Sequence, residues 1–489
     1  MANIQLVDVS IRDGNQSLWG ATGINTAQAL QAAPLLDRVG FRALDFTSST
    51  HMGIAVRTHK EDPWEMIRLM HAAAPNTPLQ LITTGFRFIS WETADIEFMQ
   101  LAYRCLIRNG VSRFAVVDPM HDMDALLEVA KRLRIEGAAE IMAGLTYTIS
   151  DIHTDQFYAD AAARLAQSPN VDRLYIKDPA GMLTPERARA LIPAVRARLG
   201  GKALELHSHC TIGLGPLTAL SAADLGVEVV HVALGPLANG TSHPDAQRLV
   251  ANLRELGHTV DIDDRALALA TDYFTRLAQA EGLPVGRPQE FDAAFLRHQI
   301  PGGVMTTMQR QLEELKLQDK LPAVMQEIER VRSDLGDPIM VTPFPQMVCT
   351  QALFNVIGKE RYDNIPDQLI RYVIGKFGRP TRPVNQAVLD RIHSLPRTKE
   401  LMNEPMLTLA DARKKFPAHL SDEEFILRAV MPDNQVDAML ATGPAKRHYN
   451  PDARPLIALL REIQNKPRTA RIVVEKPGFK LELRRAAKS

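Results

Sequence analysis

The sequence has few of the features that would place a chain outside the cell or in a membrane. Its 489 residues include three cysteines, Cys105, Cys210 and Cys349, which lie far apart and form no C-x-x-C motif. This usage argues for a reducing compartment and against a disulfide framework. The chain does not start with a basic run followed by an apolar core, and no apolar run is long enough to span a bilayer. We therefore expect a cytoplasmic protein without a membrane span.

An excess of one charge is also missing. Lys+Arg and Asp+Glu both number 57, so no net field attracts nucleic acid. No G-x-x-x-x-G-K-[ST] motif is present, and no G-x-G-x-x-G follows the first apolar run, which argues against nucleotide-binding loops of these two types. The apolar fraction of 45% is typical of a globular protein with a sizeable core.

Up to about residue 260, short apolar runs alternate with helical periods. The runs are continuous rather than alternating, which is typical of parallel strands covered by helices. About eight strand–helix units in roughly 250 residues predict an α/β fold, namely a (β/α)8 TIM barrel over residues 1–260. The expected strands are 4–10, 41–48, 78–84, 113–119, 140–148, 172–178, 203–210 and 227–234.

Side chains that can bind a metal or take part in catalysis lie where these strands end. This is where the active sites of such barrels are found. Asp13 follows the first strand, Lys177 lies at the end of the sixth, His207 and His209 end the seventh, and a glycine-bearing loop at 235–242 follows the eighth. Two histidines at positions i and i+2 of a strand point to the same side, so both can reach one divalent metal. The alternative is a histidine pair that caps loops by hydrogen bonds. The convergence with Asp13 and Lys177 favours the metal.

After residue 260 the alternation stops and helical periods dominate. We expect a mostly helical domain at 261–394 and a helical extension at 395–454. The last segment, 455–489, is expected to form a short amphipathic helix and a β-hairpin with a turn at Pro477-Gly478. A lone hairpin is only marginally stable, so this tail should dock on the protein or on a partner chain.

Taken together, the motifs resemble a known family. RDGNQS at 12–17, IKDPAGML at 176–183 and HSH at 207–209 resemble the metal motifs of a barrel metalloenzyme group that includes HMG-CoA lyase and isopropylmalate synthase. HQIPGG at 298–303 and VTPFPQMVCTQALFNV at 341–356 resemble signatures of biotin-dependent carboxyltransferase subunits. These are the carboxyltransferase subunit of pyruvate carboxylase, the oxaloacetate decarboxylase α subunit and the transcarboxylase 5S subunit. The resemblance covers roughly residues 4–390.

The resemblance implies a metal site. Asp13, His207 and His209 would be ligands, and Lys177, carbamylated to N6-carboxylysine, would complete the set. A carbamate turns a cationic lysine into an anionic oxygen donor, and a mixed oxygen and nitrogen site of this kind suits Zn, Mn or Co. For Lys177, an ion pair with Asp178 is the alternative.

The resemblance also implies a reaction. A separate carrier delivers carboxybiotin, the metal polarises the carbonyl of the acceptor, and a threonine hydroxyl passes a proton between acceptor and biotin. By its position after the glycine pair of HQIPGG, that threonine is Thr306. A helix N-cap is the alternative role, and Thr307 is the alternative residue. The candidate catalytic residues are therefore Thr306, Lys177 and Gln16.

The acceptor side departs from the family pattern. Gln16 matches the glutamine that contacts the oxo acid, and Arg12 belongs to the same motif. The family's arginine for the substrate carboxylate is replaced by Thr84, which cannot offer a bidentate cation. Arg87, three residues later, is the candidate replacement. The expected acceptor is thus pyruvate or another carbonyl compound, such as a larger 2-oxo acid, a ketone or a thioester.

No biotinylation motif of the E-A-M-K-M type occurs, so we expect biotin and its ATP-driven carboxylation on other chains. The hypothesis is a carboxyltransferase subunit of a multi-subunit biotin-dependent carboxylase. Its partners would be a biotin carboxyl carrier protein, a biotin carboxylase subunit and at least one further copy of the chain. The alternatives are a biotin-independent lyase or aldolase of the same barrel group, the reverse decarboxylation of oxaloacetate, and a non-catalytic assembly subunit.

Overall fold

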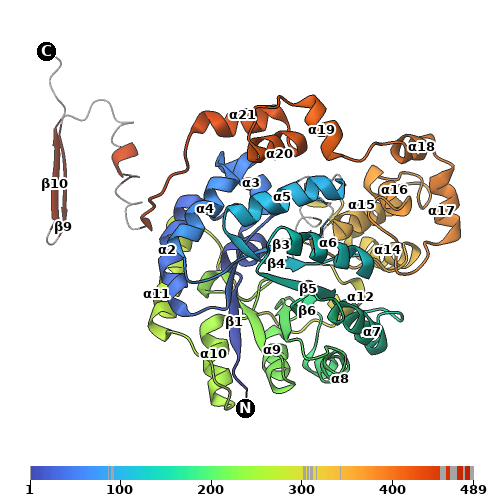
Figure 1. The fold of residues 1–489 in the computed structure, drawn as a ribbon, viewed down its shortest axis with the longest axis horizontal. Helices are drawn as coiled ribbons and strands as arrows, with labels where there is room; N and C mark the ends of the chain where they lie inside the picture. Colours follow the sequence, from blue (N-terminus) through green and yellow to red (C-terminus); the bar gives the residue numbers. More distant parts are fainter. Residues whose placement is uncertain are drawn as a thin grey trace.

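A closed barrel of eight parallel strands forms the centre of the molecule (Figure 1). The computed structural model describes residues 2–484 apart from 86, 90–92, 301–303, 306–307, 309–311, 315, 342, 452–456, 458, 463–470 and 477–478. Each strand pairs with the next in chain order, and β1 also pairs with β8, which closes the barrel. The strands are β1 (Gln5–Asp8), β2 (Ala43–Ser48), β3 (Leu79–Thr83), β4 (Val111–Val116), β5 (Glu140–Thr146), β6 (Arg173–Asp178), β7 (Leu204–Ser208) and β8 (Val229–Val232). The predicted (β/α)8 barrel is confirmed.

Helices cover the outside of the barrel (Figure 1). Their starts follow local signals, because Asn25 caps α2 in a capping box with Gln28, and Asp62 caps α4, which opens with Pro63. Together with the turns at the barrel mouth, the helical segments of this part of the chain are η1 (Ser10–Gly14), α1 (Asn15–Trp19), α2 (Thr26–Val39), α3 (Ser49–Ile54), η2 (Ala55–His59), α4 (Pro63–Ala73), α5 (Ile96–Arg108), α6 (Met123–Ile135), α7 (Asp155–Ala166), α8 (Pro185–Arg196), α9 (Gly215–Asp224), η3 (Gly235–Leu237), α10 (Ala246–Glu255) and α11 (Asp264–Glu281).

The register of the barrel places polar side chains next to one another across strands. Lys177 of β6 is the register partner of His207 of β7, and Tyr175 is the partner of Glu205. Glu205 in turn is the partner of Val229 of β8. Register partners lie side by side, so Lys177 lies directly beside His207 at the carboxyl end of the sheet.

A helical region with an apolar core of its own follows the barrel. Its core includes Ile328, Val348 and Leu369, together with Met120 from the loop after β4 of the barrel. Because Met120 joins this second core, the helical region is docked on the carboxyl ends of the barrel strands. The elements are α12 (Phe295–His298), η4 (Gln318–Lys320), α14 (Leu321–Asp334), α15 (Phe344–Ile357), α16 (Asp367–Val373), α17 (Gln386–His393) and α18 (Pro396–Met402).

Three later helices return to the barrel. They are α19 (Leu409–Lys415), α20 (Asp422–Val430) and α21 (Asp433–Thr442), and they lie along the side that carries α3 to α5 (Figure 1). Phe425 packs on Phe98 of α5 with ring centroids 6.3 Å apart. The carbonyl of Glu423 accepts the indole N–H of Trp64 at 3.2 Å, and its carboxylate accepts from Arg68 at 3.0 Å. The extension therefore belongs to the barrel's apolar core and not to that of the helical region.

The chain ends in an antiparallel hairpin of β9 (Arg471–Lys476) and β10 (Phe479–Arg484), as predicted. Arg471 and Glu482 form an ion pair of 2.9 Å across it. In Figure 1 the hairpin stands beside the barrel at the C-terminal end of the chain. The helix expected at 455–464 lies mostly outside the described residues. In the part of the chain that the structure describes, no helix combines the length and the apolar character needed to cross a membrane.

Replacing Phe425 by Ala should loosen the extension from the barrel. The Phe425 side chain is fully buried, and a buried Phe→Ala change costs about 3–5 kcal/mol. Hydrogen exchange followed by mass spectrometry should show faster exchange of the amides of α19 to α21. Leu440→Ala, whose side chain is 47% exposed, is the matched control and should leave exchange unchanged. Equal exchange in F425A and wild type would contradict the packing described.

Candidate active site

A π-helical turn begins two residues after the end of β1. All residues of this turn, η1, are buried, and turns of this kind are frequent at functional sites. The amide of Asp13 donates to the carbonyl of Val9 at 2.8 Å. A Cβ at Gly14 would lie 3.0 Å from the carbonyl oxygen of Leu237, which explains the glycine. The turn thereby brings Arg12 and Asp13 into the mouth of the barrel.

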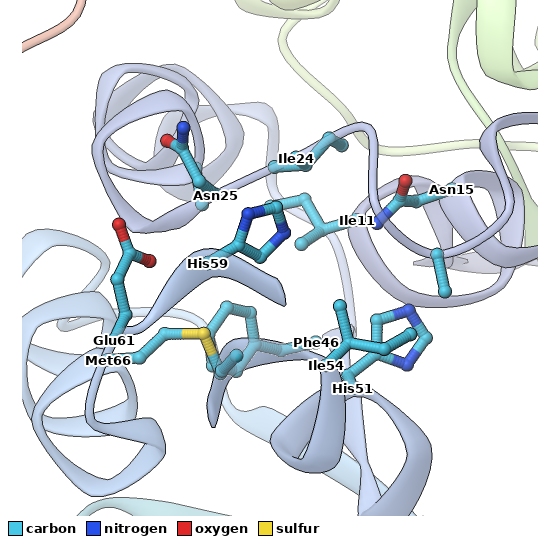
Figure 2. Close-up of a pocket in the computed structure, with 13 residues that line it drawn as sticks. Ile11, Asn15, Ile24, Asn25, Phe46, His51, Ile54, His59, Glu61 and Met66 are labelled. Carbon is cyan, nitrogen blue, oxygen red and sulfur yellow. The ribbon is translucent and has the colours of Figure 1, made fainter. Parts of the chain in front are cut away.

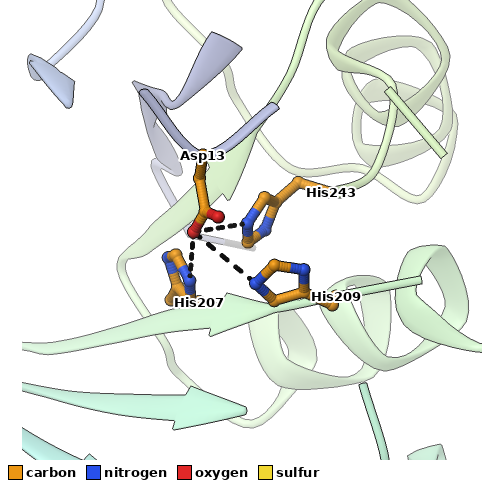
Figure 3. A group of neighbouring side chains, drawn as sticks. All are labelled: Asp13, His207, His209 and His243. Atoms are coloured by element: carbon orange, nitrogen blue, oxygen red, sulfur yellow. Dashed lines mark hydrogen bonds and ion pairs between the residues drawn. The ribbon is translucent and has the colours of Figure 1, made fainter. Parts of the chain in front are cut away.

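Asp13 meets three histidines at this mouth (Figure 3). Its Oδ2 lies 3.1 Å from Nε2 of His207, 3.5 Å from Nε2 of His209 and 3.3 Å from Nε2 of His243. All four residues are buried. His207 and His209 flank the end of β7, and His243 follows the glycine-bearing loop after β8.

The spacing of these four groups fits a divalent metal. A tetrahedral zinc with bonds of about 2.0–2.1 Å holds its ligands about 3.3 Å apart. The distances from Asp13 to the three imidazoles, 3.1 to 3.5 Å, are close to that separation, and all four ligand atoms lie within 4.8 Å of one another. One carboxylate and three imidazoles are also a donor set that zinc and its neighbours in the first transition row accept. The residues present therefore fit the metal that the fold implies.

The second nitrogen of each of two imidazoles is held by the main chain. Nδ1 of His209 donates to the carbonyl of Thr241 at 2.7 Å, and Nδ1 of His243 donates to the carbonyl of Ser208 at 3.1 Å. Partners of this kind fix the tautomer and the ring orientation of a metal-binding histidine. Each Nε2 lone pair of these two residues is thereby turned toward Asp13.

Charges around Asp13 keep it ionised. Burial by itself would raise the pKa of Asp13, but Arg12 and the histidines outweigh burial and hold that pKa well below its ordinary value. Nη1 of Arg12 lies 3.0 Å from Asp13, and its Nε donates to Asp45 at 2.9 Å. Nε, Nη1 and Nη2 of Arg12 all face these two carboxylates, so most of its donors are engaged by them.

Lys177 lies beside the cluster and does not pair with its neighbour in sequence. Its Nζ is 2.9 Å from Nε2 of His207. Burial lowers the pKa of Lys177 to about 8, although the charge of Asp13 opposes the shift. The carboxylate of Asp178 accepts the amides of Met182 and Leu183 at 2.8 and 2.9 Å instead, and the described residues contain no ion pair between Lys177 and Asp178.

Two cavities lie near the mouth, and they differ in size. The smaller one, next to η1, has a volume of ≈ 20 Å³ and is lined by His51, His59 and Glu61 among others (Figure 2). Nε2 of His59 has no hydrogen-bond partner among the described residues. The cavity has room for one water molecule, which could form a hydrogen bond with this nitrogen. The larger cavity, of ≈ 1080 Å³, is lined by Asp13, Lys177 and residues of the helical region. Only the larger one can hold a substrate.

The predicted acceptor-side residues Gln16, Thr84 and Arg87 all line the larger cavity. The guanidinium of Arg87 lies 4.1 Å above the ring of Phe377, which belongs to the helical region. Burial lowers the pKa of Arg87 to about 10, with Asp118 opposing the shift. Among the described residues, no carboxylate lies within ion-pair distance of this guanidinium. Its planar edge is thus left for an anion in the cavity.

Thr306 and Thr307 lie outside the described residues, so their predicted roles stay predictions. The other predicted site residues, Arg12, Asp13, Gln16, Thr84, Arg87, Lys177, His207 and His209, all surround the barrel mouth. Sequence reasoning missed His243. A signal was present, because His243 directly follows the glycine-bearing loop at 235–242, which leaves the eighth predicted strand at the same edge.

Comparison with known proteins matches both parts of the chain. Residues 3–273 match the family model described as HMGL-like, and residues 295–447 match the one described as a conserved carboxylase domain. A pyruvate carboxylase subunit of Methanocaldococcus jannaschii is 33% identical over 395 residues, which are 80% of this chain and 68% of that protein.

The chain belongs to the carboxyltransferase subunits of biotin-dependent carboxylases.

Further relatives agree with this assignment. The 2-oxoglutarate carboxylase large subunit of Hydrogenobacter thermophilus is 30% identical over 459 residues, 92% of this chain and 70% of that protein. The carboxyl transferase domain of Rhizobium etli pyruvate carboxylase shares the fold, with a TM-score of 0.79 and 23% identity over 90% of this chain and 78% of that one. The predicted carboxyltransferase is therefore confirmed. Because the match continues through 295–447, it favours this activity over that of a biotin-independent lyase.

Proposed function

We propose that this carboxyltransferase moves a carboxyl group from carboxybiotin, held on a separate carrier chain, to a 2-oxo acid. One observation carries the proposal: a single cavity is lined both by Asp13 of the imidazole cluster and by the guanidinium of Arg87. A group that activates a carbonyl and a cation that holds a carboxylate are the two elements that recognition of a 2-oxo acid requires.

The cluster at the mouth would hold a divalent metal, Zn, Mn or Co. Asp13, His207 and His209 would be ligands as predicted, His243 offers a further nitrogen, and Lys177 lies close enough for a carbamate on its Nζ to add an oxygen donor. When bound, the metal would polarise the acceptor's carbonyl and favour loss of the neighbouring proton.

The chain's own groups would complete the reaction. Gln16, on α1 at the rim of the cavity, would donate a hydrogen bond to the oxo acid. The hydroxyl of Thr306 would carry the proton between the acceptor carbon and biotin, as the family resemblance implies. The docked helical region closes the cavity on one side with apolar residues such as Met308, Met340 and Phe377, which exclude water from the reacting groups.

Arg87 supports a 2-oxo acid rather than a ketone or a thioester. A guanidinium stacked on an aromatic face keeps its N–H edge free for two parallel hydrogen bonds to a carboxylate. Thr84, at the end of β3, cannot provide such a fork, and Arg12 is engaged by Asp13 and Asp45. The relative that matches 92% of this chain is named for 2-oxoglutarate, a 2-oxo acid.

Replacing Arg87 by Met should raise the KM for the 2-oxo acid by roughly 10- to 100-fold, because a charge-assisted hydrogen bond contributes about 1.5–3 kcal/mol. The measurement is fixation of labelled bicarbonate into acid-stable product by the complete complex with ATP. Pyruvate, 2-oxoglutarate, acetone and a thioester would be compared as acceptors.

Arg104→Met is the matched control, because the Arg104 side chain is 54% exposed on the outer helix α5. It should leave KM unchanged. A KM in the R87M variant equal to that of the wild type, or carboxylation of acetone or the thioester alone, would show that the acceptor class is wrong.

Asp13→Asn should remove the bound metal, and Thr306→Ala should not. Both variants should lose carboxyl transfer, Thr306→Ala by about 10²- to 10⁴-fold, which is the usual contribution of a positioned proton-transfer group. Metal content by mass spectrometry of the purified chain separates the two effects. His258→Ala changes a histidine paired with Asp224 outside the cluster and serves as control. Full metal content in D13N would refute the ligand role.

The terminal hairpin is proposed as a docking element for the carrier or the biotin carboxylase subunit, in a complex that contains at least two copies of this chain. An isolated hairpin gains little stability by itself, which supports a partner for β9 and β10. Deleting residues 455–489 should therefore abolish co-elution with the two partner subunits in size-exclusion chromatography with light scattering. Metal content should be unaffected. An intact complex after the deletion would exclude the docking role.

A further inference from the structure

A row of buried side chains leads from the metal cluster into the barrel. Nδ1 of His207, at the end of β7, lies 2.9 Å from Nδ1 of His231 in β8. The other nitrogen of His231, Nε2, lies 3.2 Å from Oε2 of Glu205 in β7. Each of the three residues is at most 1% exposed. The row thus connects one imidazole of the cluster to a carboxylate that lies outside the cluster.

The charge of Glu205 decides the direction of these hydrogen bonds. Arg113 and Arg173 both donate to its Oε1, the second at 2.6 Å. Two guanidinium groups on one buried carboxylate stabilise its charged form. Glu205 is therefore an ionised carboxylate, which only accepts hydrogen bonds. Nε2 of His231 must carry the proton that Glu205 receives.

The hydrogen bond between His231 and His207 also has a defined donor. Nζ of Lys177 lies 2.9 Å from Nε2 of His207 and donates to the lone pair there, so a neutral His207 carries its proton on Nδ1 and Nδ1 of His231 accepts it. With its proton on Nε2, His231 offers the lone pair of Nδ1, so His207 donates its Nδ1–H. Nε2 of His207, 3.1 Å from Asp13, then presents its lone pair to the cluster.

His207 differs in this respect from the other two histidines of the cluster. His209 and His243 donate to main-chain carbonyls, which accept under all conditions. The partner of His207 is an imidazole, which accepts in one tautomer and donates in the other. The ring of Tyr175 stacks on His231 with centroids 6.2 Å apart and an interplanar angle of 13°. This packing keeps the imidazole ring of His231 parallel to the ring of Tyr175. Glu205 sets the tautomer of His231, and His231 in turn meets Nδ1 of His207 as an acceptor.

We propose that Glu205 and His231 are positioning residues that fix the tautomer of His207 and so present its Nε2 lone pair to the metal. The proposal rests on the metal site of the proposed function. Without an acceptor at Nδ1, His207 can place its proton on Nε2, at the position that the metal needs. Partners of this kind typically contribute 10- to 100-fold to metal affinity.

Two substitutions of similar size at position 231 test the proposal. In His231→Asn, the amide oxygen takes the place of Nδ1 and still accepts from His207, whereas His231→Leu has no acceptor. Zinc affinity of the full-length chain, measured by competition with a chromophoric chelator, should fall roughly 10- to 100-fold in H231L and stay close to wild type in H231N. His258→Leu, which changes a histidine paired with Asp224, should have no effect.

Equal affinity in H231L and wild type would overturn the proposal. An equal loss in H231N and H231L would do the same, since it would show that only packing is affected. If the wild-type chain binds no zinc, the metal site of the proposed function fails, and that result is distinct from either outcome.

A second measurement does not depend on a folded variant or on zinc. Nitrogen-15 NMR of the metal-free wild-type chain with labelled histidine distinguishes a protonated ring nitrogen from one with a lone pair. His207 should carry its proton on Nδ1, and His231 should carry its proton on Nε2. The opposite tautomer at either residue would overturn the proposal.

Discussion

The buried carboxylate of Asp13 is the group on which the rest of the site depends. Removing an ionised carboxylate from water costs several kcal/mol unless partners replace the solvent. Arg12 supplies a cation on one side, and the imidazoles of His207, His209 and His243 face it on the other. These groups come from η1, from the end of β7 and from the loop after β8, so they meet only when the barrel closes with β1 beside β8. Assembly of the site therefore requires closure of the sheet.

The reactive cavity lies between two apolar cores. The barrel contributes the carboxylate and the imidazoles, and the helical region contributes a wall that includes Phe377. Arg87 reaches from the loop after β3 to stack on that wall. The position of this cation is set by the docking of one core on the other, and a change at the contact between them would alter acceptor binding without touching the metal cluster.

Sequence reasoning found Asp13, Lys177, His207 and His209 because parallel strands end at the same edge of a barrel, whatever the details of their packing. It missed His243 because the only signal was that its loop leaves the eighth strand at the same edge, and no periodic pattern shows whether a loop side chain points inward. The guanidinium of Arg12, a predicted substrate-binding residue, contacts Asp13 and Asp45, and its role toward the substrate stays a prediction. The sequence pattern shows which side chains lie near the barrel mouth. It does not show which hydrogen bonds and ion pairs they form there.

The sequence by itself determined the barrel, the helical region after it and the strand ends that carry the site, because strand and helix periodicity and the turn signals between them are local properties of the chain. Only the tertiary structure decided which atoms meet. The register that places Lys177 beside His207, the return of His243 to the cluster and the direction of the hydrogen bonds from Glu205 through His231 depend on distances between residues far apart in sequence. Those distances follow from closure and packing, which no local pattern encodes.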